Sequence, residues 1–128
     1  MNISELIFIM MRCLLLTIAI EVFIGFLLEI KKRKDIITII IVNVITNPIV
    51  VSVPIFIHYK YGHNYYLLSL LLLEILTVLF EGLIYKLKFD YKRLNPFYIS
   101  LLLNLSSYLI GELINSFIWK EKIICLIS

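Results

Sequence analysis

Three glutamates lie inside long apolar stretches of this chain, and their carboxylates are the groups best suited to bind a proton or a small cation. They are Glu21, Glu74 and Glu81. Glu21 lies in LLTIAIEVFIGF (residues 15–26), where no residue within one helical turn could neutralise it. A charged side chain at the centre of a membrane helix costs about 2.5–3.5 kcal/mol on insertion scales, and such residues commonly mark ion or proton pathways. We therefore expect at least two of the three carboxylates to be protonated, hydrated or bound to a cation.

Each apolar segment also carries a stripe of small and polar residues. Their spacing of three, four or seven positions puts the members of a stripe on one face of a helix. In chain order the stripes are Thr17, Glu21 and Gly25; Asn43, Thr46 and Asn47; Glu74, Thr77 and Glu81; and Asn104, Ser107, Gly111 and Asn115. Four stripes of this kind can close on a common interior.

An ion or substrate site is predicted in that interior. Its predicted members are Glu21, Glu74, Glu81, Asn43, Asn47 and Asn104. The alternative is that protonated glutamates and asparagines only hold the helices together. Such interhelical hydrogen bonds average about 0.6 kcal/mol, which is small against the insertion cost, and glutamine would serve as well. Because the insertion cost exceeds the gain from such hydrogen bonds, a binding site is favoured over a packing role for these residues.

Pro48, directly after Asn47, predicts a kink in the second apolar segment. Proline has no N–H to donate, so the carbonyl of Val44 is released from the helical ladder. A freed carbonyl inside a membrane must be satisfied by protein, water or an ion. The kink could therefore contribute to an ion site, or it could be packed by neighbouring helices.

The composition predicts an integral membrane protein with an all-α fold. Of the 128 residues, 62% are hydrophobic and only 16% are charged, against about 45–50% and 25% in a soluble domain. A helix crosses the bilayer core with about 20 apolar residues, and lipid does not tolerate unpaired backbone groups. We predict a single membrane domain (1–128) with four transmembrane helices. Their predicted spans are 7–30, 36–57, 66–85 and 97–119.

The loops predict how the chain lies in the cell membrane. Residues 31–35 hold four basic side chains and residues 86–96 hold four more, whereas residues 58–65 hold only Lys60. Basic loops mark the cytoplasmic side, so both termini of this multi-pass protein are expected to be extracytoplasmic. Tyr85 is expected in the aromatic belt at the cytoplasmic interface.

An internal repeat is the second prediction about architecture. LLTIAIE (15–21) matches ILTVLFE (75–81), and IIIVNVIT (39–46) matches SLLLNLSS (100–107) after one inserted residue. Glutamate thus falls on glutamate and asparagine on asparagine. Each half is a helical hairpin that enters and returns in the same sense, so the halves are two parallel repeats about an axis along the membrane normal, an arrangement known from transporters.

Several functions are disfavoured by the sequence. The basic residues cluster in short loops beside apolar helices, which argues for a role in topology and against nucleic-acid binding. Cys13 and Cys125 form no CxxC motif and have no histidines at ligand spacing. No catalytic motif is found, so we expect no enzyme activity and no cofactor, and the sequence does not identify a metal.

The chain contains, in order, LLTxxxE, a basic loop, VNxxTNP, a second helix with glutamates and LLLNLxS. In this pattern it resembles small uncharacterised bacterial four-span membrane proteins. The resemblance implies a four-helix membrane fold and no activity, substrate or cofactor. From the residues themselves, we expect a small transporter or channel for a proton or small cation. Four helices make a narrow path, so a homodimer or a larger assembly is expected. The alternative is a non-transporting membrane subunit that stabilises or regulates a partner complex.

Overall fold

The computed structural model describes residues 2–114, and all of their regular structure is helical. The helices are α1 (Ile3–Leu27), α2 (Arg33–Tyr61), α3 (His63–Lys88) and α4 (Pro96–Ile114). Each helix is long and apolar enough to cross a membrane, so the prediction of four such helices is confirmed. The predicted end of the last span, residues 115–119, lies outside the described residues.

The first helix ends three residues earlier than its predicted span. Beyond Leu27 the chain turns at Glu29, whose φ of 70° is in the left-handed region. The N–H of Ile30 then donates to the carbonyl of Gly25 at 2.8 Å, and the N–H of Glu29 donates to the carbonyl of Phe26 at 3.0 Å. These two bonds form a Schellman motif, which closes the helix. The other end is set by Asn2, whose side chain caps the first turn.

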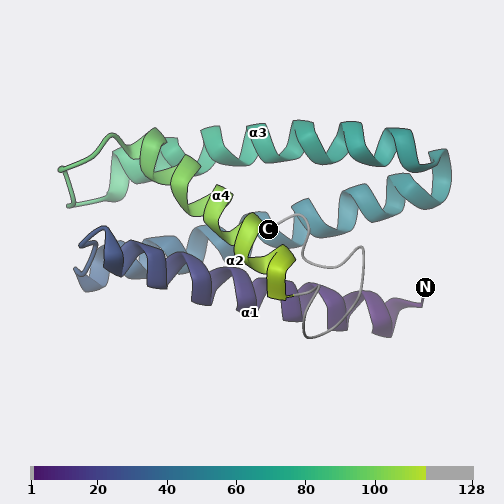
Figure 1. Cartoon of the computed structure of the whole chain (residues 1–128), viewed down its shortest axis with the longest axis horizontal. Helices are drawn as coiled ribbons and strands as arrows, with labels where there is room; N and C mark the ends of the chain where they lie inside the picture. Colours follow the sequence, from purple (N-terminus) through teal and green to yellow (C-terminus); the bar gives the residue numbers. More distant parts are fainter. Residues whose placement is uncertain (1, 115–128) are drawn as a thin grey trace.

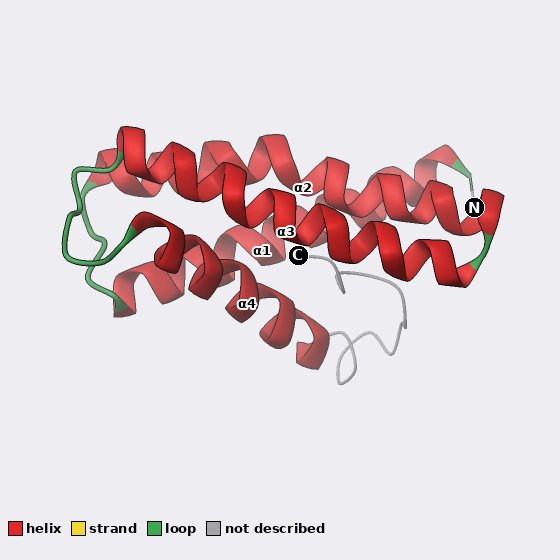
Figure 2. Cartoon of the chain, turned by 90° about the horizontal axis from the view of Figure 1, so that it is seen from above, coloured by secondary structure: helices red, strands yellow, loops and turns green. Residues whose placement is uncertain are grey.

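The four helices form a closed antiparallel ring. Among the described residues, α1 packs against α2 and α4, and α3 packs against the same two helices, whereas the diagonal pairs make no contact. Figure 1 shows α1, α2 and α3 running nearly along the long axis and α4 crossing them obliquely. In Figure 2, α4 diverges from α3 with increasing distance from the loop that joins them.

Helices α3 and α4 approach closely near that loop because Gly82 has no side chain. A Cβ atom built on Gly82 would lie 2.4 Å from Cδ1 and 3.1 Å from Cα of Phe97. One helical turn away, the hydroxyl of Ser100 donates to the carbonyl of Val78 at 2.8 Å. Small residues that bring helix backbones together are typical of membrane helix interfaces.

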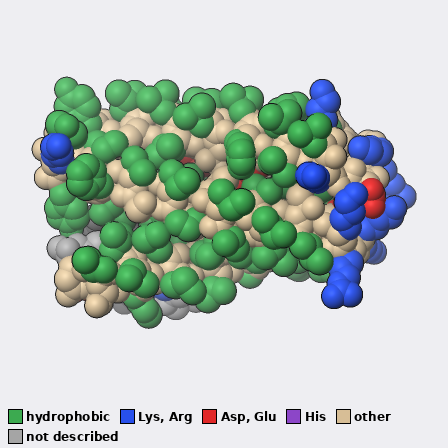
Figure 3. Space-filling view, turned by 180° about the vertical axis from the view of Figure 1, so that it is seen from behind, with side chains coloured by type: hydrophobic (Ala, Val, Ile, Leu, Met, Phe, Trp, Pro, Cys, Tyr) green, Lys and Arg blue, Asp and Glu red, His purple; other side chains and the backbone are tan. Residues whose placement is uncertain are grey.

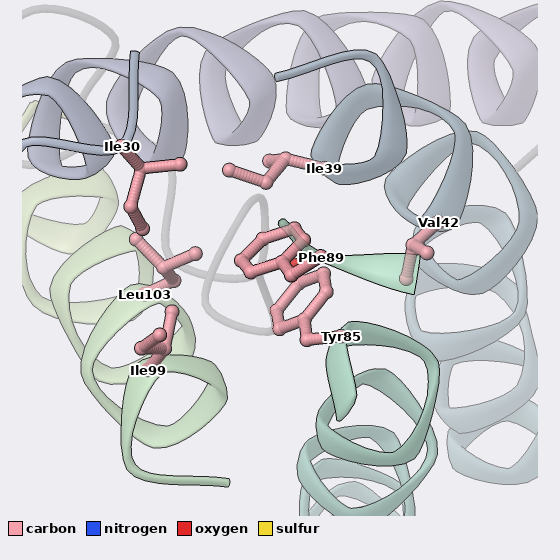
Figure 4. Packing of buried hydrophobic residues seen from close by; sticks show 7 residues of the cluster. All are labelled: Ile30, Ile39, Val42, Tyr85, Phe89, Ile99 and Leu103. Carbon is pink, nitrogen blue, oxygen red and sulfur yellow. The ribbon is translucent and has the colours of Figure 1, made fainter. Parts of the chain in front are cut away.

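Two apolar clusters fill the two halves of the bundle. The cluster beside the loops 28–32 and 89–95 consists of Ile30, Ile39, Val42, Tyr85, Phe89, Ile99 and Leu103. In Figure 4 the rings of Tyr85 and Phe89 lie against each other, with centroids 4.4 Å apart. The other cluster consists of Ile9, Cys13, Val51 and Ile55. The polar residues of the interior lie between these two clusters along the bundle axis.

The loop end of the bundle is held by one buried carboxylate. Asp35 accepts hydrogen bonds from the backbone N–H groups of Asp90 at 2.8 Å and Tyr91 at 3.1 Å. The hydroxyl of Tyr91 donates to the carbonyl of Leu28 at 2.8 Å, and Lys34 pairs with Asp90 at 3.2 Å. These contacts fix the two basic loops side by side.

The surface follows the expected division between lipid and water. Figure 3 shows hydrophobic side chains over the sides of the bundle and most Lys and Arg side chains gathered at one end. The exposed large apolar residues come from all four helices. A surface of this kind suits a hydrocarbon environment around the bundle and water at its ends.

Candidate functional site

A layer of polar side chains occupies the interior between the two apolar clusters, and all four helices contribute to it. Its buried members are Thr17, Glu21, Asn43, Thr46, Asn47, Thr77, Glu81, Ser100, Asn104 and Ser107. The stripes read from the sequence therefore face one another. The helical spacing of each stripe is the local cause, because it puts these members on the side of their helix that the ring encloses. The stripe member Asn115 lies outside the described residues.

Glu81 accepts hydrogen bonds from three other members of the polar interior. It is 0% exposed. Its Oε2 accepts from the hydroxyl of Thr46 on α2 at 2.9 Å, and its Oε1 accepts from Nδ2 of Asn104 on α4 at 3.0 Å. The hydroxyl of Tyr85, one turn along α3, lies 3.5 Å from Oε1. The carboxylate thus connects three helices.

Glu21 is equally buried but has no such connections. Its side chain is 0% exposed, and among the described residues neither carboxylate oxygen has a hydrogen-bond partner. Asn43 on α2 is a polar neighbour, although its Nδ2 donates instead to the carbonyl of Ile39 at 2.9 Å. Glu81 is close enough to repel a charge on Glu21. Within residues 2–114, no basic side chain pairs with either glutamate.

The remaining predicted site residues, Asn47 and Glu74, lie farther than this pair from the loops 28–32 and 89–95. Nδ2 of Asn47 is 3.4 Å from the hydroxyl of Thr17, and Oδ1 of Asn47 is buried without a hydrogen-bond partner among the described residues. Glu74 is seven residues from Glu81, about 10 Å along the helix, and is only partly buried. The structure therefore separates Glu74 from the enclosed pair.

Two grooves lead from the surface of the bundle to the buried layer. One has a volume of about 460 Å³, lies between α3 and α4, and is lined by Glu74, Asn104 and Tyr108 among apolar side chains. The other has a volume of about 220 Å³, lies between α2 and α3, and is lined by Thr46 and Thr77. Both grooves open on the sides of the bundle, where the lipid would be.

Pro48 and Pro54 lie inside α2, which remains one helix from Arg33 to Tyr61. The predicted kink at Pro48 and its role in an ion site therefore stay predictions. The described residues contain no group of three or more His, Cys, Asp or Glu side chains that could hold a metal ion.

Tyr85 was expected at the membrane interface, and that prediction is wrong. The side chain is fully buried, because Tyr85 follows Glu81 by four residues and so shares its inward face. Ser100 was not expected in the interior either, although it precedes Asn104 by four residues and accepts a bond from that amide through its carbonyl at 2.8 Å. The same periodicity that identified the stripes could have identified both residues.

No protein-family model, no curated protein and no solved structure matches this chain. The chemistry of the site must therefore be judged from its own geometry. Carboxylate, amide and hydroxyl oxygens converge in a space without a basic partner among the described side chains. Such a set can hold a proton between oxygens or bind a hard cation.

Proposed function

We propose that this protein is a small membrane transporter or channel for a proton or small cation, with Glu21 and Glu81 as its binding groups and Asn43 and Asn104 beside them. The observation that carries the proposal is the pair of fully buried carboxylates in the middle of the bundle. A proton or cation would satisfy oxygens that no described side chain satisfies, most clearly those of Glu21.

The cost of placing a glutamate in the membrane, compared with the gain from its hydrogen bonds, supports a functional role over a packing role. A carboxylate inside the membrane costs about 2.5–3.5 kcal/mol on insertion scales, and interhelical hydrogen bonds return about 0.6 kcal/mol each. Glu81 accepts two such bonds, from Thr46 and Asn104, and one within α3 from Tyr85, so packing could account for part of its cost. Glu21 accepts none among the described residues, so packing gives no reason for a carboxylate at that position.

We also propose that the two hairpins are parallel repeats. Asn43 donates to the carbonyl four residues before it, and Asn104, its counterpart in the alignment, does the same. Each hairpin contributes a buried glutamate and an asparagine at the matching position, Glu21 with Asn43 and Glu81 with Asn104. This correspondence supports a duplicated hairpin with one binding layer in each half.

The basic end of the bundle is proposed to face the cytoplasm, which would put both termini on the outer side of the cell membrane. The gathering of Lys and Arg at one end supports this orientation (Figure 3). The interior is too narrow for a wide aqueous pore, since buried side chains fill it above and below the polar layer. We therefore propose a homodimer as the working unit.

Ion flux into proteoliposomes tests the proposal. Protons, Na⁺ and K⁺ are each tested with the wild type and with Glu21→Gln, Glu81→Gln and Glu5→Gln; Glu5 is an exposed glutamate at the start of α1 and is the matched control. We expect one ion to move with the wild type and the control, and its flux to disappear in both interior variants. No flux with any protein, with unchanged stability of the variants, would reject the proposal and favour the subunit role.

A further inference from the structure

The larger groove, between α3 and α4, has features of a ligand site in addition to being a route to the interior. Its volume of about 460 Å³ falls within the 300–1,000 Å³ typical of pockets for small organic molecules. Its walls are almost entirely leucine, isoleucine and valine, and its polar lining residues are Glu74, Asn104 and Tyr108. A few polar groups in an apolar cleft are the usual composition of such a pocket.

Glu74 gives the groove its charge. Oε1 of Glu74 is buried and has no hydrogen-bond partner among the described residues, and no basic side chain within residues 2–114 pairs with it. An ionised carboxylate at this position would be costly without a partner, so a positive charge in the groove would be stabilised beside Glu74. Tyr108 adds an aromatic ring, whose face attracts cations.

We propose that the α3–α4 groove binds an amphiphilic organic cation, with the ammonium or phosphonium centre beside Glu74 and the apolar body against the leucine walls. A hydrated divalent metal fits less well, because Ca²⁺ and Mg²⁺ require six or more oxygen ligands and the groove offers one carboxylate, one amide and one phenol. The groove opens toward the lipid-facing side, so a ligand that partitions into the bilayer can reach it directly.

Asn104 connects the groove to the buried carboxylates. It lines the groove and donates to Glu81 at 3.0 Å, so an occupant of the groove contacts the hydrogen-bond network of the interior. The inference rests on the proposed function in this one respect, since an occupant of the groove would influence the transported ion through Asn104 and Glu81. Binding to Glu74 itself requires no transport.

Equilibrium binding of tetraphenylphosphonium to the purified full-length protein in lipid nanodiscs tests the inference, with empty nanodiscs as the blank. Neutral triphenylphosphine oxide, of similar shape, is the ligand control. Removing one partner of a half-buried charge pair costs about 1.4 kcal/mol or more, or about tenfold in affinity. We therefore expect Glu74→Gln to weaken tetraphenylphosphonium binding about tenfold, and Glu74→Asp and Glu5→Gln to retain binding.

Equal binding of the neutral compound, or undiminished binding in Glu74→Gln, would overturn the inference and leave the groove as ordinary lipid-facing surface. Occupation of the groove by a second copy of the chain would also overturn the inference. In that case the wild type would bind no tetraphenylphosphonium and Glu74→Gln would have an altered oligomer size. Ion flux that depends on Glu81, without any tetraphenylphosphonium binding, would reject the groove as a cation site and leave the proposed transport standing. Binding that depends on Glu74 without ion flux would support the groove and reject the proposed transport.

Discussion

Replacing Gly82 with alanine should loosen the contact between α3 and α4 and destabilise the bundle. The new Cβ would lie 2.4 Å from Cδ1 and 3.1 Å from Cα of Phe97. The ring of Phe97 can rotate away, but its Cα moves only if α4 moves with it. The substitution therefore pushes the two helices apart at the point where they are closest.

The expected loss can be worked out from two opposing terms. Inserting a methyl group into a packed interface costs about 1–3 kcal/mol, and alanine regains up to about 1 kcal/mol over glycine in a helix. Because the new contact includes the Cα of Phe97, the cost lies at about 2–3 kcal/mol, and the net loss for Gly82→Ala is about 1–2 kcal/mol. Gly25 offers a matched control, because a Cβ there would meet Ile39 at 3.6 Å and Ile30 at 3.9 Å, which is ordinary contact. Gly25→Ala should change the stability by less than about 0.5 kcal/mol, since it lies in the last turn of α1.

Unfolding of both variants by SDS in mixed micelles, followed by circular dichroism, measures these differences. We expect the unfolding midpoint of Gly82→Ala to fall clearly below that of the wild type and the midpoint of Gly25→Ala to stay close to it. If Gly82→Ala is as stable as the wild type, or if Gly25→Ala is the less stable of the two, the helix packing described for α3 and α4 is wrong.

Two further predictions concern single contacts. Thr46→Val keeps the shape of the side chain but removes the donor to Glu81, so it should cost about 0.5–1.5 kcal/mol of stability; a midpoint equal to that of the wild type in the same SDS titration would argue against this contact. Asp35→Ala removes the acceptor for two backbone N–H groups of the loop 89–95 and should cost about 1–3 kcal/mol. It should also speed tryptic cleavage at Lys92, and an unchanged cleavage rate would contradict the role given to Asp35.

The inward orientation of the polar residues could be predicted because helical periodicity alone determines it. Thr17, Glu21 and Asn43 were expected on interior faces and are buried there. Four apolar segments likewise predict four helices. The helix ends could not be predicted equally well, because they depend on local hydrogen bonds such as the one that closes α1 at Gly25.

The separation of Glu74 from the interior pair could not be read from its stripe. Glu74 and Glu81 share a helix face, but α4 diverges from α3 beyond the contact at Gly82 (Figure 2). A groove opens in the resulting space, and Glu74 lines it. The crossing of two helices depends on residues that contact each other across the interface, here Gly82 and Phe97. The residue pattern of one segment does not show which residue of another helix it contacts.

The loop contacts at the basic end were also beyond sequence analysis. Asp35 and Tyr91 are far apart in the chain and meet only because the helices bring their loops to one end. The short basic segment around Asp35 indicated topology, and nothing in its composition indicated that the one acidic residue would be buried.

The proposed ion pathway depends most directly on the carboxylate of Glu81. Ion flux through the Glu81→Asp variant, compared with flux through Glu81→Gln, tests this dependence. Aspartate keeps an ionisable group on the same face of α3, whereas glutamine keeps the size of the side chain, replaces one accepting oxygen with a donating amide group and loses the charge. Measured in proteoliposomes at equal protein density, Glu81→Asp should retain measurable flux of the transported ion and Glu81→Gln should have none. Equal flux through the two variants would contradict a carboxylate-based pathway.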